Sequence, residues 1–373
     1  MKKTLVAVAA MAAITGAMAD AKISGILDQA AITTSKTDAD GAKTTTKSFG
    51  EDLNGYSELG VSGSEDLGNG LTATYGINLS LSAATGGNNP AVYNGTGVGL
   101  KGGFGAVTIG TSYNLNFFTN AIADASGFAG ASVGQLNGSA GGLKSNILTY
   151  NAPEFVPGLS LAAEIQRGGN TTNAGNLTGY MAQYATGGLL VRYSDSTKTE
   201  AANAVTNAYD SATGAASTTD TYSNQLLTTK IGGTATALAD RTALDKTKAT
   251  AIALTYDFGM AKVFYGSSSI KSSTTVAQIK SNTTGVSVPL GAFNVAYAVS
   301  SEKGTADGTD TGGAGLDSGD TVSSKGSRLF VTYALSKRTT LYGMSGKASV
   351  DSIAGESSTL KTTTTSVGIK HAF

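Results

Sequence analysis

Few residues of this chain have side chains that could catalyse a reaction or hold a metal. The chain contains one histidine, His371, and no cysteine. A zinc site built on thiolates and imidazoles, or a nucleophile activated by histidine, therefore lacks its parts. Strand alternation also places His371 on an outward face beside Phe373. We expect no enzymatic activity, no metal site and no cofactor.

Two other segments resemble ligand sites only weakly. The glycines of residues 95–99 are not followed by the Gly-Lys-Ser/Thr of a phosphate-binding loop. The aspartates of residues 307–320 lack the ordered ligand series and terminal glutamate of a calcium loop. We interpret the first segment as a strand with small residues and the second as a solvated loop.

Charged residues that interrupt alternating apolar segments are more informative. Successive side chains of a strand point to opposite faces, so a charge between outward apolar residues must point inward, toward water. The residues that meet this condition are Glu58, Lys101, Glu164, Arg192, Lys262, Arg328 and Lys370. For most of them, solubilising the wall of a channel is a sufficient interpretation.

The segments that carry these charges have the period of two of a β-strand. From Leu71 to Leu81, apolar residues alternate with polar, uncharged ones over eleven positions. Repetition of this pattern at about ten residues, with aromatic ends, is typical of strands that cross a bilayer between lipid and a wet lumen. The expected strands lie near 22–32, 54–63, 70–82, 93–101, 104–112, 144–151, 158–166, 177–185, 188–195, 248–257, 260–269, 282–288, 291–300, 326–335, 338–348 and 363–373.

The connections between these strands alternate between short and long. The long ones are 33–53, 113–143, 196–247, 301–325 and 349–362. A barrel inserted from one side of a membrane has short periplasmic turns and long outer loops. The sequence therefore predicts an all-β fold, a 16-stranded antiparallel transmembrane β-barrel.

The N-terminal residues predict export. Lys2 and Lys3 precede an apolar run over 5–14 and small residues that end at Ala19, which is the order of a secretory signal peptide. We expect a signal peptide over 1–19 and the barrel over 20–373. Without the signal peptide, the formal charge falls from zero to about −2, which argues against nucleic acid as a partner.

Several motifs resemble the general porins of Gram-negative bacteria, especially the proteobacterial type. The matching segments are 57–71 (SELGVSGSEDLGNGL), 99–105, 150–155, 335–339 and the ending 367–373. The resemblance implies an outer-membrane homotrimer that contacts lipid, with a third loop, here about 113–143, folded into each pore. It also implies that Phe373 is an assembly signal read by the barrel-assembly machinery. The outer loop at about 196–247 is expanded relative to the family.

These observations together predict a water-filled channel for passive diffusion of ions and small hydrophilic solutes. An open lumen is favoured by small residues at inward positions, namely Thr72, Thr74, Gly76, Ala296 and Ala298. Two alternatives remain at this point. One is a surface adhesin or structural barrel with a plugged pore, and the other is a soluble exported β-sandwich that binds carbohydrate.

The third loop carries little charge. Asp124 is its one charged residue between Tyr113 and Leu143, with Asn114 and Asn116 nearby. Relatives often have arginine where this chain has Glu58. The sequence therefore predicts a weak preference for cations, due to Glu58 and Asp124 and opposed by Lys101.

Overall fold

The computed structural model describes residues 21–37, 41–50, 57–81, 93–125, 143–167, 175–200, 246–272, 276–306, 321–351 and 360–373. The expected signal peptide, residues 126–142 of the expected constriction loop and residues 201–245 of the expected expanded loop lie outside this part. Within the described residues, no helix has both the length and the apolar character needed to cross a bilayer.

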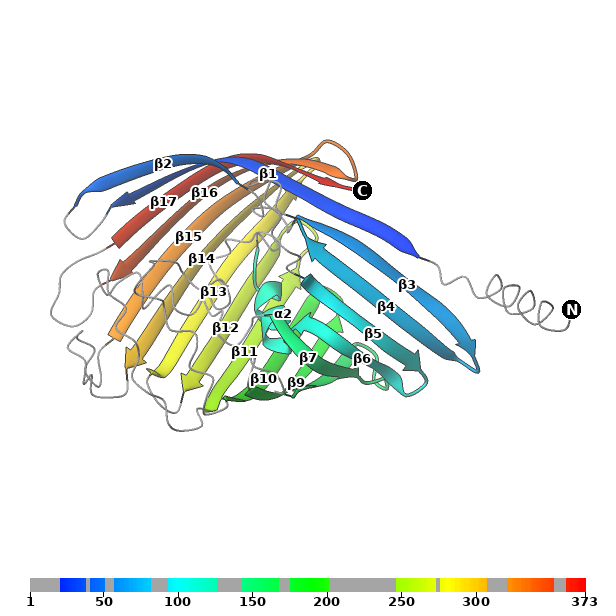
Figure 1. The fold of residues 1–373 in the computed structure, drawn as a ribbon. Coiled ribbons are helices and arrows are strands. Elements are labelled where there is room, and N and C mark those ends of the chain that lie inside the picture. Colours follow the sequence, from blue (N-terminus) through cyan, green and yellow to red (C-terminus); the bar gives the residue numbers. More distant parts are fainter. Residues whose placement is uncertain are drawn as a thin grey trace, which may run out of the picture.

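Antiparallel strands pair in chain order and close into a ring (Figure 1). The strands are β1 (Lys22–Thr37), β2 (Lys43–Gly50), β3 (Glu58–Gly68), β4 (Leu71–Ser80), β5 (Tyr93–Gly102), β6 (Gly105–Tyr113), β7 (Leu143–Asn151), β8 (Leu159–Gln166), β9 (Gly175–Thr186), β10 (Leu189–Glu200), β11 (Lys246–Asp257), β12 (Lys262–Ser272), β13 (Val276–Leu290), β14 (Phe293–Ala306), β15 (Thr321–Ala334), β16 (Thr339–Asp351) and β17 (Leu360–Ala372). Both β2 and β3 pair with β1, along different parts of it. Together they therefore occupy a single strand position in the barrel. The 17-stranded sheet therefore closes as the predicted 16-stranded barrel.

The predicted strand positions are correct, but the strands are longer than expected at the loop end. The expected loop 33–53 contains the end of β1 and all of β2, whose sequence KTTTKSFG has no apolar alternation. The opposite ends match the predicted short turns within one or two residues, except that β3 continues to Gly68, five residues past its expected end. The turn between β3 and β4, for example, contains Asn69 and Gly70, both with positive φ, as a tight turn requires.

The two faces of the barrel wall follow strand parity. On β14, Tyr297 and Val299 are exposed on the outside, whereas Ala296 and Ala298 are buried on the inside. On β15, Leu329 is exposed and its neighbour Phe330 is 1% exposed. The outside is therefore apolar and accessible, as lipid contact requires, and the luminal face is covered by other parts of the chain.

A group of large apolar side chains lines part of the luminal face, which the sequence analysis did not predict. Phe264, Phe330, Tyr342 and Met344 pack with small residues of β1 and β14 and with Ala125. The rings of Phe330 and Tyr342 stack at 5.6 Å between centroids. The small-residue lining expected from the sequence is thus interrupted on this side of the barrel.

The barrel closes where β1 meets β17. Asp28 pairs in register with Lys370 on the luminal face, and the Asp28 carboxylate also accepts a 2.6 Å hydrogen bond from the Tyr342 hydroxyl. Ser57, just before β3, exchanges hydrogen bonds with the Asp28 backbone. Strands from both ends of the chain are therefore tied together around one buried carboxylate.

Candidate functional site in the lumen

A short helix, α2 (Leu115–Ile122), follows β6 and lies inside the ring of strands, as Figure 1 shows. Asn114 caps it, because its side chain accepts a hydrogen bond from the Phe117 backbone N–H at 2.9 Å. The Thr119 hydroxyl bonds the Leu115 carbonyl at 2.9 Å. The rings of Tyr113, at the end of β6, and Phe117, in α2, stack with their centroids 4.0 Å apart. This contact packs the start of the helix against the end of the strand.

Glu164 of β8 fixes the N-terminus of α2 to the barrel wall. The Leu115 backbone N–H points at both carboxylate oxygens, at 3.2 and 3.1 Å. This N–H has no partner within the helix, and a carboxylate is favoured by the helix dipole at this end. Glu164 is 2% exposed, so its negative charge acts on the N-terminus of α2 and is shielded from the lumen.

Asn116 ties the first turn of α2 to two further strands. Its side-chain amide donates to the Ser196 hydroxyl of β10 at 2.8 Å and to the Ala249 carbonyl of β11 at 3.0 Å. Asn116 is 2% exposed. The predicted residues Asn114, Asn116 and Glu164 therefore form one cluster, and its role is to hold the segment in place.

Two wall glycines make room for the end of the segment. A Cβ atom at Gly285 of β13 would lie 2.6 Å from the Ala125 Cβ, and one at Gly266 of β12 would overlap the Ala123 Cβ. Real Cβ atoms do not approach so closely, so glycine allows the segment to pack directly against the wall. We call Gly266 and Gly285 the wall glycines.

Asp124 faces a positive charge. It is 7% exposed, and the guanidinium of Arg328, also 7% exposed, lies within its electrostatic reach. Arg328 comes from β15, whereas α2 packs against β9 to β12. The loop carboxylate and the wall guanidinium therefore attract each other.

A cavity of about 390 Å³ lies beside α2. Its walls are Thr96, Thr108, Gly110, Thr111, Ser112, Tyr113, Leu115, Phe118, Ile147, Thr149, Asn151, Met181 and Arg192. Arg192 is the charged member of this lining, and its Nε donates to the Gln183 amide oxygen at 2.9 Å. Polar, uncharged groups, apolar side chains such as Leu115, Phe118 and Ile147, and one guanidinium thus surround the space next to the constricting segment.

The remaining predicted residues lie elsewhere on the wall. Glu58 begins β3 and pairs with Ile26 and Ser80, away from β9 to β12, against which α2 packs. Lys101 and Lys262 lie at strand ends next to short turns, and the Lys262 ammonium lies 5.2 Å from the centre of the Phe264 ring. These three residues are separate from the α2 cluster.

Sequence reasoning missed Ser196, Gln183 and the wall glycines. No local pattern could have identified Ser196 or Gln183, because each matters only through a partner on another element. The cap at Asn114 before the amphipathic segment LNFFTNAI is a helix-start signal that was available in the sequence.

A closed barrel with a polar lumen and a segment folded into it defines a channel-type outer-membrane β-barrel. Residues 6–352 match the family described as Gram-negative porin. The chain is 31% identical over 224 residues to the major outer membrane protein P.IB of Neisseria gonorrhoeae, covering 53% of this chain and 60% of that protein. The chain belongs to the Gram-negative porin family, whose members lie in the outer membrane.

Solved structures show the same fold over nearly the whole chain. An anion-selective porin from Comamonas acidovorans superposes with a TM-score of 0.70 at 18% identity, covering 95% of this chain and 100% of that one. The trimer form of OmpT from Vibrio cholerae gives a TM-score of 0.63 at 14% identity, covering 95% and 99%. At such identities the likeness concerns the fold alone.

The wall glycines yield a test of how α2 is placed. In Gly285→Ala the new methyl group pushes Ala125 away from the wall and into the lumen, so single-channel conductance should fall. Gly346→Ala is the matched control, because a Cβ there meets nothing closer than 3.8 Å. Equal conductance in the two variants would show that the contact does not position the segment.

Proposed function

We propose that this chain forms a water-filled channel for the passive diffusion of ions and small hydrophilic solutes across the outer membrane. The observation that carries the proposal is the position of α2. The helix is fixed to the inner wall by Glu164 and Asn116, and a cavity lined by both polar and apolar side chains remains beside it. A segment held to the wall narrows a lumen without filling it.

Polar groups on the luminal face support a hydrated interior. Among the described residues, Gln166 Oε1, Ser194 Oγ and Ser366 Oγ are buried on that face and have no protein hydrogen-bond partner. Buried polar groups without a protein partner are normally hydrated. Ordered water molecules within the luminal wall are the partners that such groups require.

The function is tested by recording purified protein in planar bilayers. We expect stepwise, ohmic conductance increments, since the lumen is open and polar. The same preparation should show a heat-modifiable band in gel electrophoresis, which reports a folded barrel. A folded barrel without conductance would favour the adhesin or structural alternative, in which the pore is plugged.

The contacts of the carboxylates bear on ion selectivity. The sequence-based hypothesis attributes a cation preference to Glu58 and Asp124, and it remains a prediction. Arg328 lies near Asp124, so Asp124 contributes less to a cation preference. The Leu115 N–H at the α2 N-terminus is hydrogen-bonded to Glu164 and offsets its negative charge. Arg192, by contrast, bonds a neutral amide and lines the cavity. We infer that Arg192 and Glu58 act in opposite directions and leave the channel weakly selective.

Reversal potentials in a potassium chloride gradient test this inference. Arg192→Gln should move the permeability ratio toward cations by about a factor of two, and Glu58→Gln should move it toward anions, because pore charges set local ion concentrations. Arg338→Gln, in an exposed turn outside the lumen, serves as the control. No shift in either luminal variant would contradict the assignment.

Three further proposals concern assembly and export. We infer a signal peptide over 1–19, a homotrimer, and recognition of the C-terminal strand by the barrel-assembly machinery. The last rests on Phe373, whose ring is 46% exposed on the outside. The Phe373 backbone exchanges hydrogen bonds with Gly25 at 2.9 and 3.0 Å, and its ring lies over Gly25, where a Cβ would not fit.

Phe373→Ala retains both backbone hydrogen bonds and removes the ring. We expect outer-membrane yield in cells to fall several-fold, while refolding yield in detergent changes less than about twofold, because an exposed ring contributes little packing. Val367→Ala is the control, since Val367 is an outward apolar residue of the same strand and is 70% exposed. Equal losses in cells and in detergent would point to a purely structural role.

A further inference from the structure

One wall of the cavity beside α2 is apolar. Leu115, Ile147 and Met181 line it from α2, β7 and β9, and all three are buried. Phe118 also lines the cavity and is 42% exposed, although α2 lies inside the barrel. Contact between apolar surface and water is unfavourable, and covering that surface with an apolar group is favourable. This wall therefore favours a solute that carries an apolar group.

The Phe118 ring has a defined orientation, because two other rings hold it. It meets the rings of Tyr113 and Phe117 edge to face, with centroids 6.4 and 5.7 Å apart and interplanar angles of 81° and 78°. Tyr113 lines the cavity as well. Aromatic rings pack on one another in edge-to-face or offset-stacked pairs. The exposed surface of Phe118 is therefore suited to a further ring supplied by a solute.

Arg192 adds a fixed positive charge to the same cavity. Its Nε donates to the Gln183 amide oxygen at 2.9 Å, which orients the guanidinium. Among the described residues, no carboxylate forms an ion pair with Arg192, and its two Nη groups bond no other side chain. A guanidinium with free Nη donors binds a carboxylate through two parallel hydrogen bonds. Arg192 therefore favours a solute that carries a carboxylate.

The rest of the polar lining is neutral. Thr108 and Thr149 are register partners on β6 and β7, and Asn151 ends β7. The described lining contains no carboxylate. An ammonium group in the cavity would face Arg192 without a negative partner, so amines and amino acids fit the cavity poorly. An anion with an apolar group fits both walls.

The cavity lies on the short-turn side of α2. Arg192 is three residues from the start of β10, and Asn151 is the last residue of β7 before a turn. Ser196, which bonds Asn116 of α2, is four residues further along β10 than Arg192. A solute that passes α2 from the outer side therefore reaches this cavity next.

We propose that the cavity beside α2 is a binding site for aromatic carboxylates on their way through the channel. The Arg192 guanidinium binds the carboxylate, and Phe118 packs against the ring. This inference rests on the proposed channel function and names a class of solute for it. The binding is weak, because a solute must also leave the site in order to cross.

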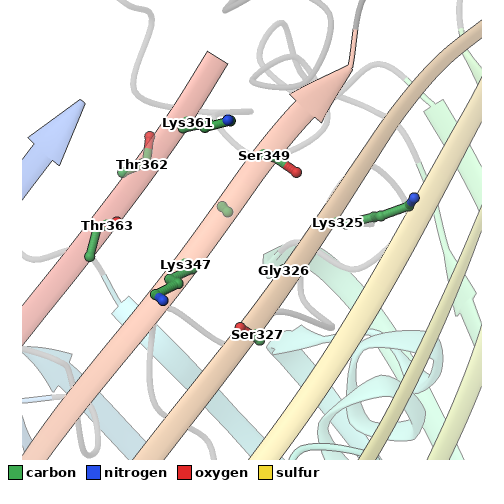
Figure 2. A pocket seen from close by; sticks show the side chains of 9 residues that line it. Lys325, Gly326, Ser327, Lys347, Ser349, Lys361, Thr362 and Thr363 are labelled. Carbon is green, nitrogen blue, oxygen red and sulfur yellow. The ribbon is translucent and has the colours of Figure 1, made fainter. Parts of the chain in front are cut away.

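Two residues outside the lumen provide matched controls. Figure 2 shows Lys347 with Lys325 and Lys361 on the adjacent strands β15 to β17, where they line a shallow depression. Lys347 shares the outward parity of the exposed Leu341, so Lys347→Gln removes one positive charge outside the lumen. Phe155 is 63% exposed next to a short turn, so Phe155→Ala removes a ring outside the lumen.

The test measures the binding of 4-fluorobenzoate to the full chain refolded in detergent. Fluorine NMR line widths report the bound fraction, and protein-free micelles provide the reference. Fluoroacetate has the same charge without the ring, and 4-fluorobenzyl alcohol has the ring without the charge. The site variants are Arg192→Gln and Phe118→Ala, and a heat-modifiable band shows that each is folded. If Phe118→Ala does not fold, Phe118→Leu replaces it, since leucine fills space without an aromatic face.

The wild type should bind 4-fluorobenzoate at least about tenfold more tightly than either partial probe, because only this probe engages both walls. Arg192→Gln and the Phe118 variant should each weaken this binding at least about fivefold, and the two controls should change it less than about twofold. Equal affinities for 4-fluorobenzoate and fluoroacetate would indicate a general attraction of anions and would overturn the proposal. Equal losses in Arg192→Gln and Lys347→Gln would overturn it as well.

Planar-bilayer recordings separate this inference from the proposed channel function. In the wild type, 4-fluorobenzoate should interrupt the single-channel current in proportion to its occupancy, and Arg192→Gln should remove the interruptions. A conducting channel that does not bind 4-fluorobenzoate would overturn the site and leave the channel function standing. A folded barrel that binds the probe through Arg192 but does not conduct would support the site and overturn the channel function.

Discussion

Every backbone N–H and C=O that enters the hydrocarbon region must find a partner within the protein, because lipid offers none. An open sheet leaves two unpaired edges, and closure removes them. Here the condition is met where β17 pairs with β1 over Ile26 to Thr37. The buried residues Asp28 and Tyr342 and the half-buried Lys370 lie at this seam. The sixteen strand positions, the two chemically different faces and the lumen all depend on this closure.

Closure at this strand number creates a second problem, because wall side chains cannot fill so wide an interior. The chain meets it in two ways. Phe264, Phe330, Tyr342 and Met344 thicken part of the wall. Next to them α2 enters the lumen, and its free N–H and the Asn116 amide are bonded by Glu164, Ser196 and Ala249. The helix therefore narrows the lumen while the Leu115 N–H at its N-terminus is bonded to the wall.

The sequence predicted the strands well because parity is a local property. Alternation over Leu71–Leu81 needs no knowledge of any partner strand. Strand ends such as Lys43–Gly50 were missed because lysines and threonine on one face and threonines and serine on the other carry no apolar period, although threonine favours strands. Phe330 was not predicted as a packed luminal residue because residues 329–331 are all apolar and do not alternate with polar ones, so no local pattern shows that the luminal face of β15 is covered.

The contacts of the candidate site could not be predicted for a different reason. The wall glycines are required because Ala123 and Ala125 pack against them. Arg328 belongs to the site because it lies near Asp124. Each pair joins residues far apart in the chain. On β14 the same parity rule separates adjacent residues: Glu302 is buried on the luminal side and Lys303 is exposed on the outer side. Residues one position apart therefore pack inside the barrel in one case and meet the membrane interface in the other, so neighbouring positions of a single strand can be altered by evolution independently for the interior and for lipid contact.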